Sequence, residues 1–172
     1  LADAARDTIG PWVFAHDNAE TVTALAGIRA KLGNDARVDY SPGVSIIARE
    51  NPSFFDALPG FDVAPLVEVD DDAEIARAVA LANSADCAVL VLGEAQNQIG
   101  EAASRSSFDL PGRQQELLEA VIATGKPVVL LLMNARPLDL KGATPHAIVN
   151  IWYPGSQAGA AVANMLFGDA PP

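Results

Sequence analysis

The chain has 172 residues, half of them apolar, and its 11 basic and 22 acidic side chains give a formal net charge of −11. This length is enough for one domain with a sizeable core. The acidic balance argues against nucleic acid or an anionic membrane as a partner, and solubility is its simplest explanation. No apolar run approaches the roughly 18 residues that would span a bilayer.

The first forty residues alternate between irregular and regular patterns. Residues 1–16 are expected to be irregular. A helix is predicted from about residue 19 to residue 32, with Asn18 as its N-cap and Gly33 at its end. Residues 37–40 are short and β-prone.

A long loop and a helix are predicted next. Prolines and glycines punctuate residues 45–69, which therefore favour a long packed loop. Its candidate anchors are aromatic: Phe54, Phe55 and Phe61. The acidic run 70–72 predicts the N-terminus of a helix over 72–85, where aspartate caps and favours the helix dipole. We prefer this to a metal site, because no other ligand spacing is visible.

Continuous apolar runs alternate with helical patterns in the second half of the chain. The predicted strands cover 87–92, 128–132 and 147–151, and the predicted helices cover 112–124 and 157–167. Apolar strands between helices imply a parallel sheet that is covered on both faces. We therefore expect one α/β domain over residues 1–172, a three-layer α/β/α sandwich with a mainly parallel sheet.

Three side chains of rare residue types are expected to be buried in the core. Cys87 is the single cysteine, which allows no internal disulfide. It opens an apolar strand and is expected to be a small buried residue. Trp12 and Trp152 could stack on a sugar, but a buried tryptophan is the commoner case.

The chemistry-bearing residues follow the ends of the predicted strands. Phosphate-binding, zinc and serine-esterase motifs are absent. Glu94 ends the first strand, and Glu101 and Arg105 follow in its loop. Asn134 and Arg136 follow the second strand and are expected to shape the same cleft, because ligands bind outside the carboxyl ends of such strands. A glutamic acid in a cleft can act as a general acid, although an ordinary solvated loop carries the same residues.

Three blocks of the sequence, taken in order, carry a family resemblance. They are 91–118, with Val-Leu-Gly-Glu at its start and Gly-Glu-Ala-Ala-Ser-Arg in its loop, 124–138, and 152–169. Together they resemble the C-terminal α/β-sandwich domain of glycoside hydrolase family 3, most closely that of bacterial periplasmic β-glucosidases. The resemblance covers essentially the whole chain. It implies one domain of a longer protein, with the family's N-terminal TIM-like barrel absent from this chain.

The resemblance implies a retaining β-glucosidase that hydrolyses terminal β-D-glucosyl residues between the barrel and this domain. The barrel would contribute the nucleophilic aspartate, and Glu101 matches the general acid/base. Arg105 and Glu94 match neighbouring family positions and are assigned to substrate binding, with support of the loop as the alternative for Glu94. Ala102 and Ser104 depart from the family's commoner glycine and aspartate.

The resemblance also implies partners and a location. The partners are a β-glucoside or oligosaccharide and the barrel of the same protein, with no cofactor and no metal, in the periplasm or outside the cell. The chain alone is expected to fold without glycosidase activity. Asp109 is expected to cap the helix after it rather than replace the missing nucleophile. Because family members have a strand just before the position of Leu1, an exposed sheet edge prone to self-association is expected.

Two other functions remain open from the residues. One is a carbohydrate-binding or interaction module that makes no catalytic contribution. The other is an unrelated flavodoxin-like domain, which would bind flavin and colour the protein yellow.

Overall fold

The computed structural model describes residues 1–13, 15–52 and 66–171. The elements follow one another as α1 (Ala5–Ile9), the 3₁₀ helix η1 (Asn18–Glu20), α2 (Ala24–Leu32), α3 (Asp71–Ser84), β1 (Ala88–Gly93), the 3₁₀ helix η3 (Gln96–Gln98), α4 (Gln114–Ile122), β2 (Val128–Met133), β3 (Ala147–Asn150) and α5 (Ala158–Leu166). The predicted loop anchors Phe54, Phe55 and Phe61 lie outside the described residues.

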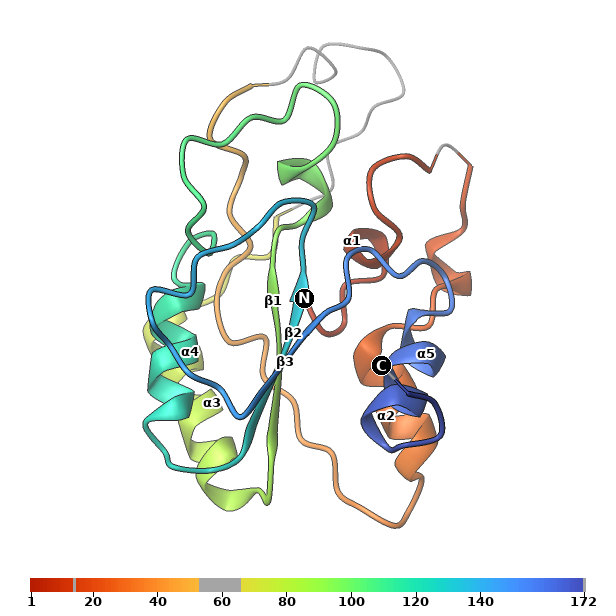
Figure 1. Ribbon diagram of the computed structural model, residues 1–172, viewed down its shortest axis with the longest axis vertical. Helices are drawn as coiled ribbons and strands as arrows, with labels where there is room; N and C mark the ends of the chain where they lie inside the picture. Colours follow the sequence, from red (N-terminus) through yellow and green to blue (C-terminus); the bar gives the residue numbers. More distant parts are fainter. Residues whose placement is uncertain (14, 53–65, 172) are drawn as a thin grey trace.

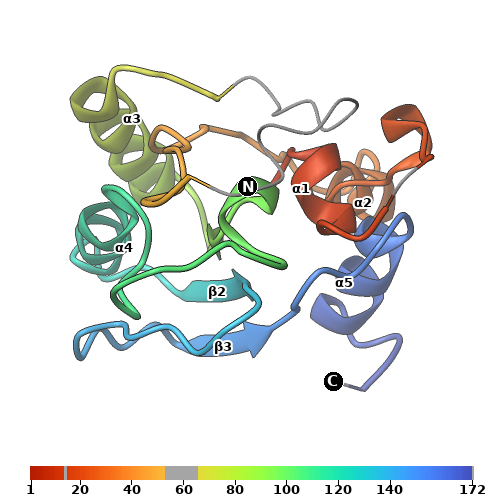
Figure 2. The same cartoon turned by 90° about the horizontal axis from the view of Figure 1, so that it is seen from above.

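The strands form a parallel sheet in the order β1-β2-β3. Helices α3 and α4 cover one face, and α1, α2 and α5 lie on the other (Figure 1). The view from above shows the same separation of the helices into two layers (Figure 2). The predicted three-layer α/β/α sandwich with a parallel sheet is therefore confirmed. In the described part of the chain, β1 and β3 each pair with β2 alone, which leaves their outer edges unpaired.

The middle strand supplies both halves of the core. Leu130 and Leu132 pack in the cluster on the side of α3 and α4, whereas Leu131 and Met133 pack in the cluster on the side of α2 and α5. This alternation arises because successive side chains of a strand point to opposite faces. The edge strand β3 differs from its predicted burial, since Ile148 is 50% exposed.

Side chains cap the N-termini of α2, α3 and the turn η1. Asp70 caps α3 by accepting a hydrogen bond from the backbone of Ala73 at 3.1 Å, as expected from the acidic run. The predicted start of α2 was wrong, because Thr23 caps this helix and Asp17 caps the separate turn η1. Gly33 ends α2, as predicted, with a φ of 53°.

Several local expectations were wrong. Residues 5–9 form α1 instead of an irregular segment, and residues 37–40 form no strand. Cys87 is exposed and precedes β1. Trp12 and Trp152 are 58% and 55% exposed, so neither belongs to the core. Within the described ranges, no helix is long and apolar enough to cross a membrane.

Candidate active site

Strand β1 ends at a glycine that no other residue could replace. Gly93 has a φ of 135°, and a β-carbon there would lie 2.0 Å from the carbonyl oxygen of Met133. The side chain of Gln114 holds the same residue, accepting from its N–H at 2.7 Å and donating to its carbonyl oxygen at 2.8 Å. This tight exit delivers Glu94 to the end of β2, where its N–H donates to Met133 at 2.8 Å.

Glu94 is fully buried and its carboxylate is bonded on both oxygens. Oε1 lies 3.3 Å from Nη1 of Arg105 and 3.1 Å from Nε of Arg136. Oε2 accepts a hydrogen bond from the backbone of Ala135 at 3.1 Å. Buried charges are stable when paired and hydrogen-bonded in this way. Glu94 thus joins the loop after β1 to the loop after β2.

The hydroxyl of Tyr153 fixes the backbone of the same residue by donating to the carbonyl oxygen of Glu94 at 2.9 Å. Burial, and secondly the charge of Glu94, raise the pKa of Tyr153. The phenol therefore stays protonated at neutral pH and remains a donor. The segment after β3 thereby contributes to the same strand-end cluster.

The first turn of the loop is tied to its surroundings by side-chain amides. Gln98 accepts from the N–H of Ala95 at 2.9 Å and donates to the carbonyl oxygen of Ile47 at 3.3 Å. The N–H of Gln96 donates to Asp7 of α1 at 2.7 Å. Burial raises the pKa of Asp7, and this hydrogen bond opposes the rise. The loop is thus fastened to α1 and to the segment before residue 53.

Glu101 lies on the exposed part of this loop, between two residues with left-handed backbone conformations. Gly100 has a φ of 91° and Ala102 a φ of 60°. A β-carbon on Gly100 would lie 3.1 Å from the ring of Pro11, so α1's following segment packs against the turn. The chain returns to the interior at Ala103, which is buried. The carboxylate of Glu101 is therefore presented to solvent by a turn with buried neighbours.

Arg136 holds this turn from the neighbouring strand end. Its Nη2 donates to the carbonyl oxygens of Gln98 at 3.2 Å and Ala103 at 3.0 Å. Asn134 is buried and donates through Nδ2 to the carbonyl oxygen of Arg136 at 2.6 Å. Sequence reasoning placed both residues at this edge but missed the link to Glu94. The available signal was the parallel pairing of the two strands, which brings their following residues together.

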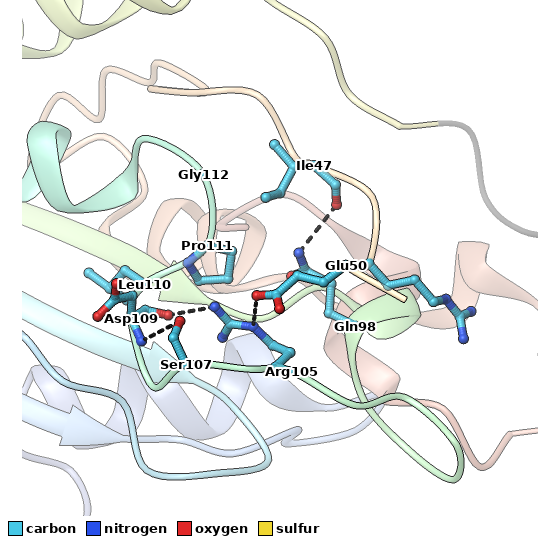
Figure 3. Close-up of a pocket in the computed structure, with 10 residues that line it drawn as sticks. Ile47, Glu50, Gln98, Arg105, Ser107, Asp109, Leu110, Pro111 and Gly112 are labelled. Carbon is cyan, nitrogen blue, oxygen red and sulfur yellow. Dashed lines mark hydrogen bonds and ion pairs between the residues drawn. The ribbon is translucent and has the colours of Figure 1, made fainter. Parts of the chain in front are cut away.

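Arg105 connects the buried cluster to a pocket of about 200 Å³ (Figure 3). It donates through Nη2 to the carbonyl oxygen of Asp109 at 2.7 Å, and its Nε lies 3.5 Å from Oε1 of Glu50. Glu50 accepts from the N–H and the hydroxyl of Ser106 at 3.0 and 2.7 Å. The Ser106 backbone bond, followed by its hydroxyl bond, holds the pKa of Glu50 below its usual range.

Asp109 does not cap helix α4, contrary to expectation. Its carboxylate pairs with Nζ of Lys141 at 2.9 Å, and its backbone bridges to Asp139. The residue at the N-cap of α4 is Arg113, which forms no side-chain cap. Asp109 is therefore part of the loop framework.

The structure brings two of the three predicted site residues into contact. Glu94 and Arg105 form an ion pair in the interior, with 0% and 5% of their side chains exposed. Glu101 lies apart from the buried pair, on the exposed turn. No group of three histidine, cysteine, aspartate or glutamate residues in the described ranges could hold a metal ion. An exposed carboxyl group on an ordered turn can transfer protons to a bound molecule.

Comparison with known proteins identifies relatives along the full chain. The family description "Glycosyl hydrolase family 3 C-terminal domain" matches residues 2–172. A "Periplasmic beta-glucosidase" of Salmonella typhimurium is 40% identical over 177 residues, covering 100% of this chain and 23% of that protein. A "Beta-xylosidase" of Formosa agariphila is 33% identical, covering 88% of this chain and 18% of that protein. The chain thus spans about a quarter or less of these relatives.

Solved structures of β-glucosidases have a similar fold. The β-glucosidase from Listeria innocua in complex with isofagomine matches with a TM-score of 0.74 and 25% identity, covering 99% of this chain and 20% of that one. A β-glucosidase involved in saponin metabolism from intestinal bacteria matches with a TM-score of 0.72 and 26% identity. It covers 98% of this chain and 26% of that one.

Proposed function

The chain belongs to the glycoside hydrolase family 3 C-terminal domains, and we propose that it contributes the general acid/base to a retaining β-glucosidase. Its relatives are named as β-glucosidase and β-xylosidase, so the family is one of glycosidases. The proposed substrate is a β-glucoside or oligosaccharide with a terminal β-D-glucosyl residue. The proposed partner is an N-terminal TIM-like barrel of the same protein, which contributes the nucleophile.

The exposure of Glu101 carries this proposal. Of the two glutamates that follow β1, Glu94 is fully buried with both carboxylate oxygens bonded, whereas Glu101 is exposed. A proton donor must reach the glycosidic oxygen of a bound sugar. An exposed turn at the carboxyl edge of the sheet is also the surface that a second domain can cover. Glu101 is therefore the better candidate for the acid/base.

The proposed reaction has two steps. In the first, the barrel's carboxylate attacks the anomeric carbon while the bond to the leaving oxygen breaks, and protonated Glu101 gives its proton to that oxygen. In the second, a water molecule attacks the anomeric carbon, Glu101 takes a proton from the water, and the barrel's carboxylate leaves. Retention of configuration requires the two carboxyl groups to stand about 5–5.5 Å apart, which sets the geometry of docking.

Substrate binding by Glu94 and Arg105 stays a prediction. The polar atoms of both side chains are engaged inside the chain, with Glu94 bonded to Arg136 and Arg105 to Asp109. This favours support of the loop for Glu94, the alternative that its sequence position left open. A periplasmic or secreted location is proposed from the name of the Salmonella relative.

The test is Glu101→Ala in the full-length protein that carries this chain. General acid catalysis contributes about 10²–10⁴-fold, so hydrolysis of phenyl β-glucoside should fall by that factor. With 2,4-dinitrophenyl β-glucoside, whose leaving group needs no proton, formation of the glycosyl-enzyme should change far less. Azide should then accelerate turnover by replacing water. Glu119→Ala, an exposed change on α4, is the matched control.

Two results would contradict the proposal. If Glu94→Ala rather than Glu101→Ala produced this dependence on the leaving group, the acid/base assignment would be wrong. If Glu101→Ala left turnover intact while the chain bound sugars in a titration, the domain would be a carbohydrate-binding module.

A further inference from the structure

The turn that carries Glu101 is fastened on both sides by one side chain from another strand end. Arg136 donates through Nη2 to the carbonyl oxygens of Gln98 and Ala103, at 3.2 and 3.0 Å. These two residues flank Glu101 in the sequence, and both are buried. We propose that Arg136, anchored on Glu94, is the positioning residue for the proton-donating carboxyl group. The inference rests on the proposed function of Glu101 and extends it.

Two carbonyl bonds to one nitrogen close the turn into a loop with a fixed base. The backbone between these carbonyls includes the two left-handed residues, Gly100 and Ala102. Glu101 between them has an exposed side chain, so its position depends mainly on the backbone that carries it. Fixing the base of the turn therefore limits the positions that the carboxyl group can reach.

The guanidinium is itself fixed by a buried anion. Its Nε lies 3.1 Å from Oε1 of Glu94, whose other oxygen accepts the N–H of Ala135 at 3.1 Å. The carbonyl oxygen of Arg136 accepts from Asn134 at 2.6 Å. Both the side chain and the backbone of Arg136 are thus tied to the end of β2, next to β1. Arg136 thereby links the residues that follow both strands to the turn that carries Glu101.

Only arginine suits these three contacts together. Its planar fork can direct Nε to Glu94 and Nη2 to two carbonyl oxygens. A lysine ammonium is a single point of charge on a flexible stem. It could keep the pair with Glu94 and lose one or both carbonyl bonds. The Lys variant therefore separates the charge of Arg136 from its geometry.

Mispositioning the acid should have a specific kinetic effect. A displacement of about 1 Å can lower a rate about 10²-fold. The loss should appear where the leaving group needs a proton and be small where it does not. A residue that only stabilises the fold would lower both rates equally, through the fraction of folded enzyme.

The experiment uses the full-length protein with Arg136→Gln, Arg136→Lys and the control Arg113→Gln. Arg113 forms ion pairs with Asp72 and Glu116 on the surface around α4. For Arg136→Gln we expect kcat/KM for phenyl β-glucoside to fall about 10²-fold and that for 2,4-dinitrophenyl β-glucoside to fall less than about 10-fold. For Arg136→Lys, kcat/KM for phenyl β-glucoside should lie between the values of Arg136→Gln and wild type. Arg113→Gln should change kcat/KM for neither substrate.

A double variant tests whether the two residues act on the same step. When Glu101→Ala is already present, adding Arg136→Gln should cause little further loss with phenyl β-glucoside, because no acid remains to be positioned. Equal losses on both substrates for Arg136→Gln, or full additivity in the double variant, would overturn the inference. If the Gln variant does not fold, the same comparison is made with Arg136→Lys. A greater loss of kcat/KM for phenyl than for 2,4-dinitrophenyl β-glucoside supports the inference, and equal losses overturn it.

The two proposals fail differently. If Glu101→Ala shows no dependence on the leaving group, the proposed function itself is wrong. If Glu101→Ala shows that dependence and neither Arg136 variant does, Glu101 remains the acid/base and only the positioning role of Arg136 is wrong.

Discussion

Ala102 carries a backbone conformation that suits glycine better than alanine. Its φ is 60°, and left-handed backbone costs an L-residue roughly 1–2 kcal/mol. The family resemblance implies glycine as the commoner residue at this position, and a left-handed turn favours glycine. The strain is tolerated here because the neighbours of the turn are buried or bonded.

We expect Ala102→Gly to raise the free energy of unfolding. Relief of the strain exceeds the added flexibility of the unfolded chain, which leaves a net gain of about 0.5–1 kcal/mol. Ala123→Gly is the control, because Ala123 is exposed with an ordinary φ of −61° and should lose stability on the same change. Urea unfolding of the 172-residue chain measures both, and a loss of stability for Ala102→Gly would contradict the argument.

Glu94 is predicted to be structurally indispensable. Glu94→Gln would leave two guanidinium groups, of Arg105 and Arg136, without their buried carboxylate, and removing one partner from such a buried pair costs about 3–5 kcal/mol. The exposed change Glu116→Gln breaks a surface pair with Arg113 and should cost less than about 1 kcal/mol. Chemical denaturation of both variants gives the comparison. Unchanged stability for Glu94→Gln, with weakened sugar binding, would favour the substrate-binding role instead.

At the scale of secondary-structure elements, hydrogen bonds of Asp7 join helix α1 to the turn η3. The carboxylate accepts from the backbone of Gln96 at 2.7 Å, and the side-chain amide of Gln96 donates to the carbonyl oxygen of Gly10 at 2.5 Å. Arg6 donates to the same amide at 2.7 Å. A short helix that sequence patterning missed thereby supports the loop of the candidate site.

Asp7 should make stability depend on pH in one direction. Burial raises its pKa in the folded state above the ordinary value of 3.8, so folding favours the protonated form. Its contribution is therefore fully present below pH 3.8 and is lost as the pH rises through the raised folded pKa. Asp7→Asn keeps an oxygen acceptor for Gln96 and should be relatively more stable than wild type above that window.

The measurement is the difference in unfolding free energy between wild type and Asp7→Asn as a function of pH. The surface change Asp86→Asn removes an equal charge and reports the general electrostatic effect. A difference curve for Asp7→Asn in which wild type gains relative stability as the pH rises would show that the hydrogen bond with Gln96 outweighs burial.

At the scale of the whole molecule, the chain supplies one of the two carboxyl groups that the proposed reaction needs. Retaining hydrolysis needs two carboxyl groups, one as the nucleophile and one as the general acid/base. Glu94 is buried and Asp109 is paired with Lys141, so neither suits the second role. Glu50, at the pocket, accepts two hydrogen bonds from Ser106 and pairs with Arg105. Among the glutamates of the candidate site, Glu101 is the one that is left. The proposed second carboxylate belongs to the barrel.

We therefore expect the 172-residue chain alone to fold and to be inactive. A purified sample should show cooperative urea unfolding, and it should release no phenol from aryl β-glucosides, including the 2,4-dinitrophenyl substrate. The full-length protein under the same conditions is the positive control. Turnover by the chain alone, abolished by Glu101→Ala, would show that the chain holds a complete site.

Local patterns in the sequence determined most of the secondary structure and the fold class. Apolar runs, capping aspartates and terminating glycines act over a few residues, so β1, β2, α3 and the parallel sandwich could be predicted. The family's motifs also marked Glu94, Glu101 and Arg105. The short helix α1 had no comparable periodic signal.

Only the tertiary structure decided which side chains are buried and which residues they contact. An apolar run does not state what covers it, so β3 was expected to be buried and lies at an exposed edge. Two glutamates in one loop have the same chemistry until packing separates them. The meeting of two strand ends encloses Glu94 between two arginines, while a left-handed turn leaves Glu101 in solvent. Because these contacts join residues far apart in the chain, no local pattern could assign Arg136 to the turn that carries Glu101.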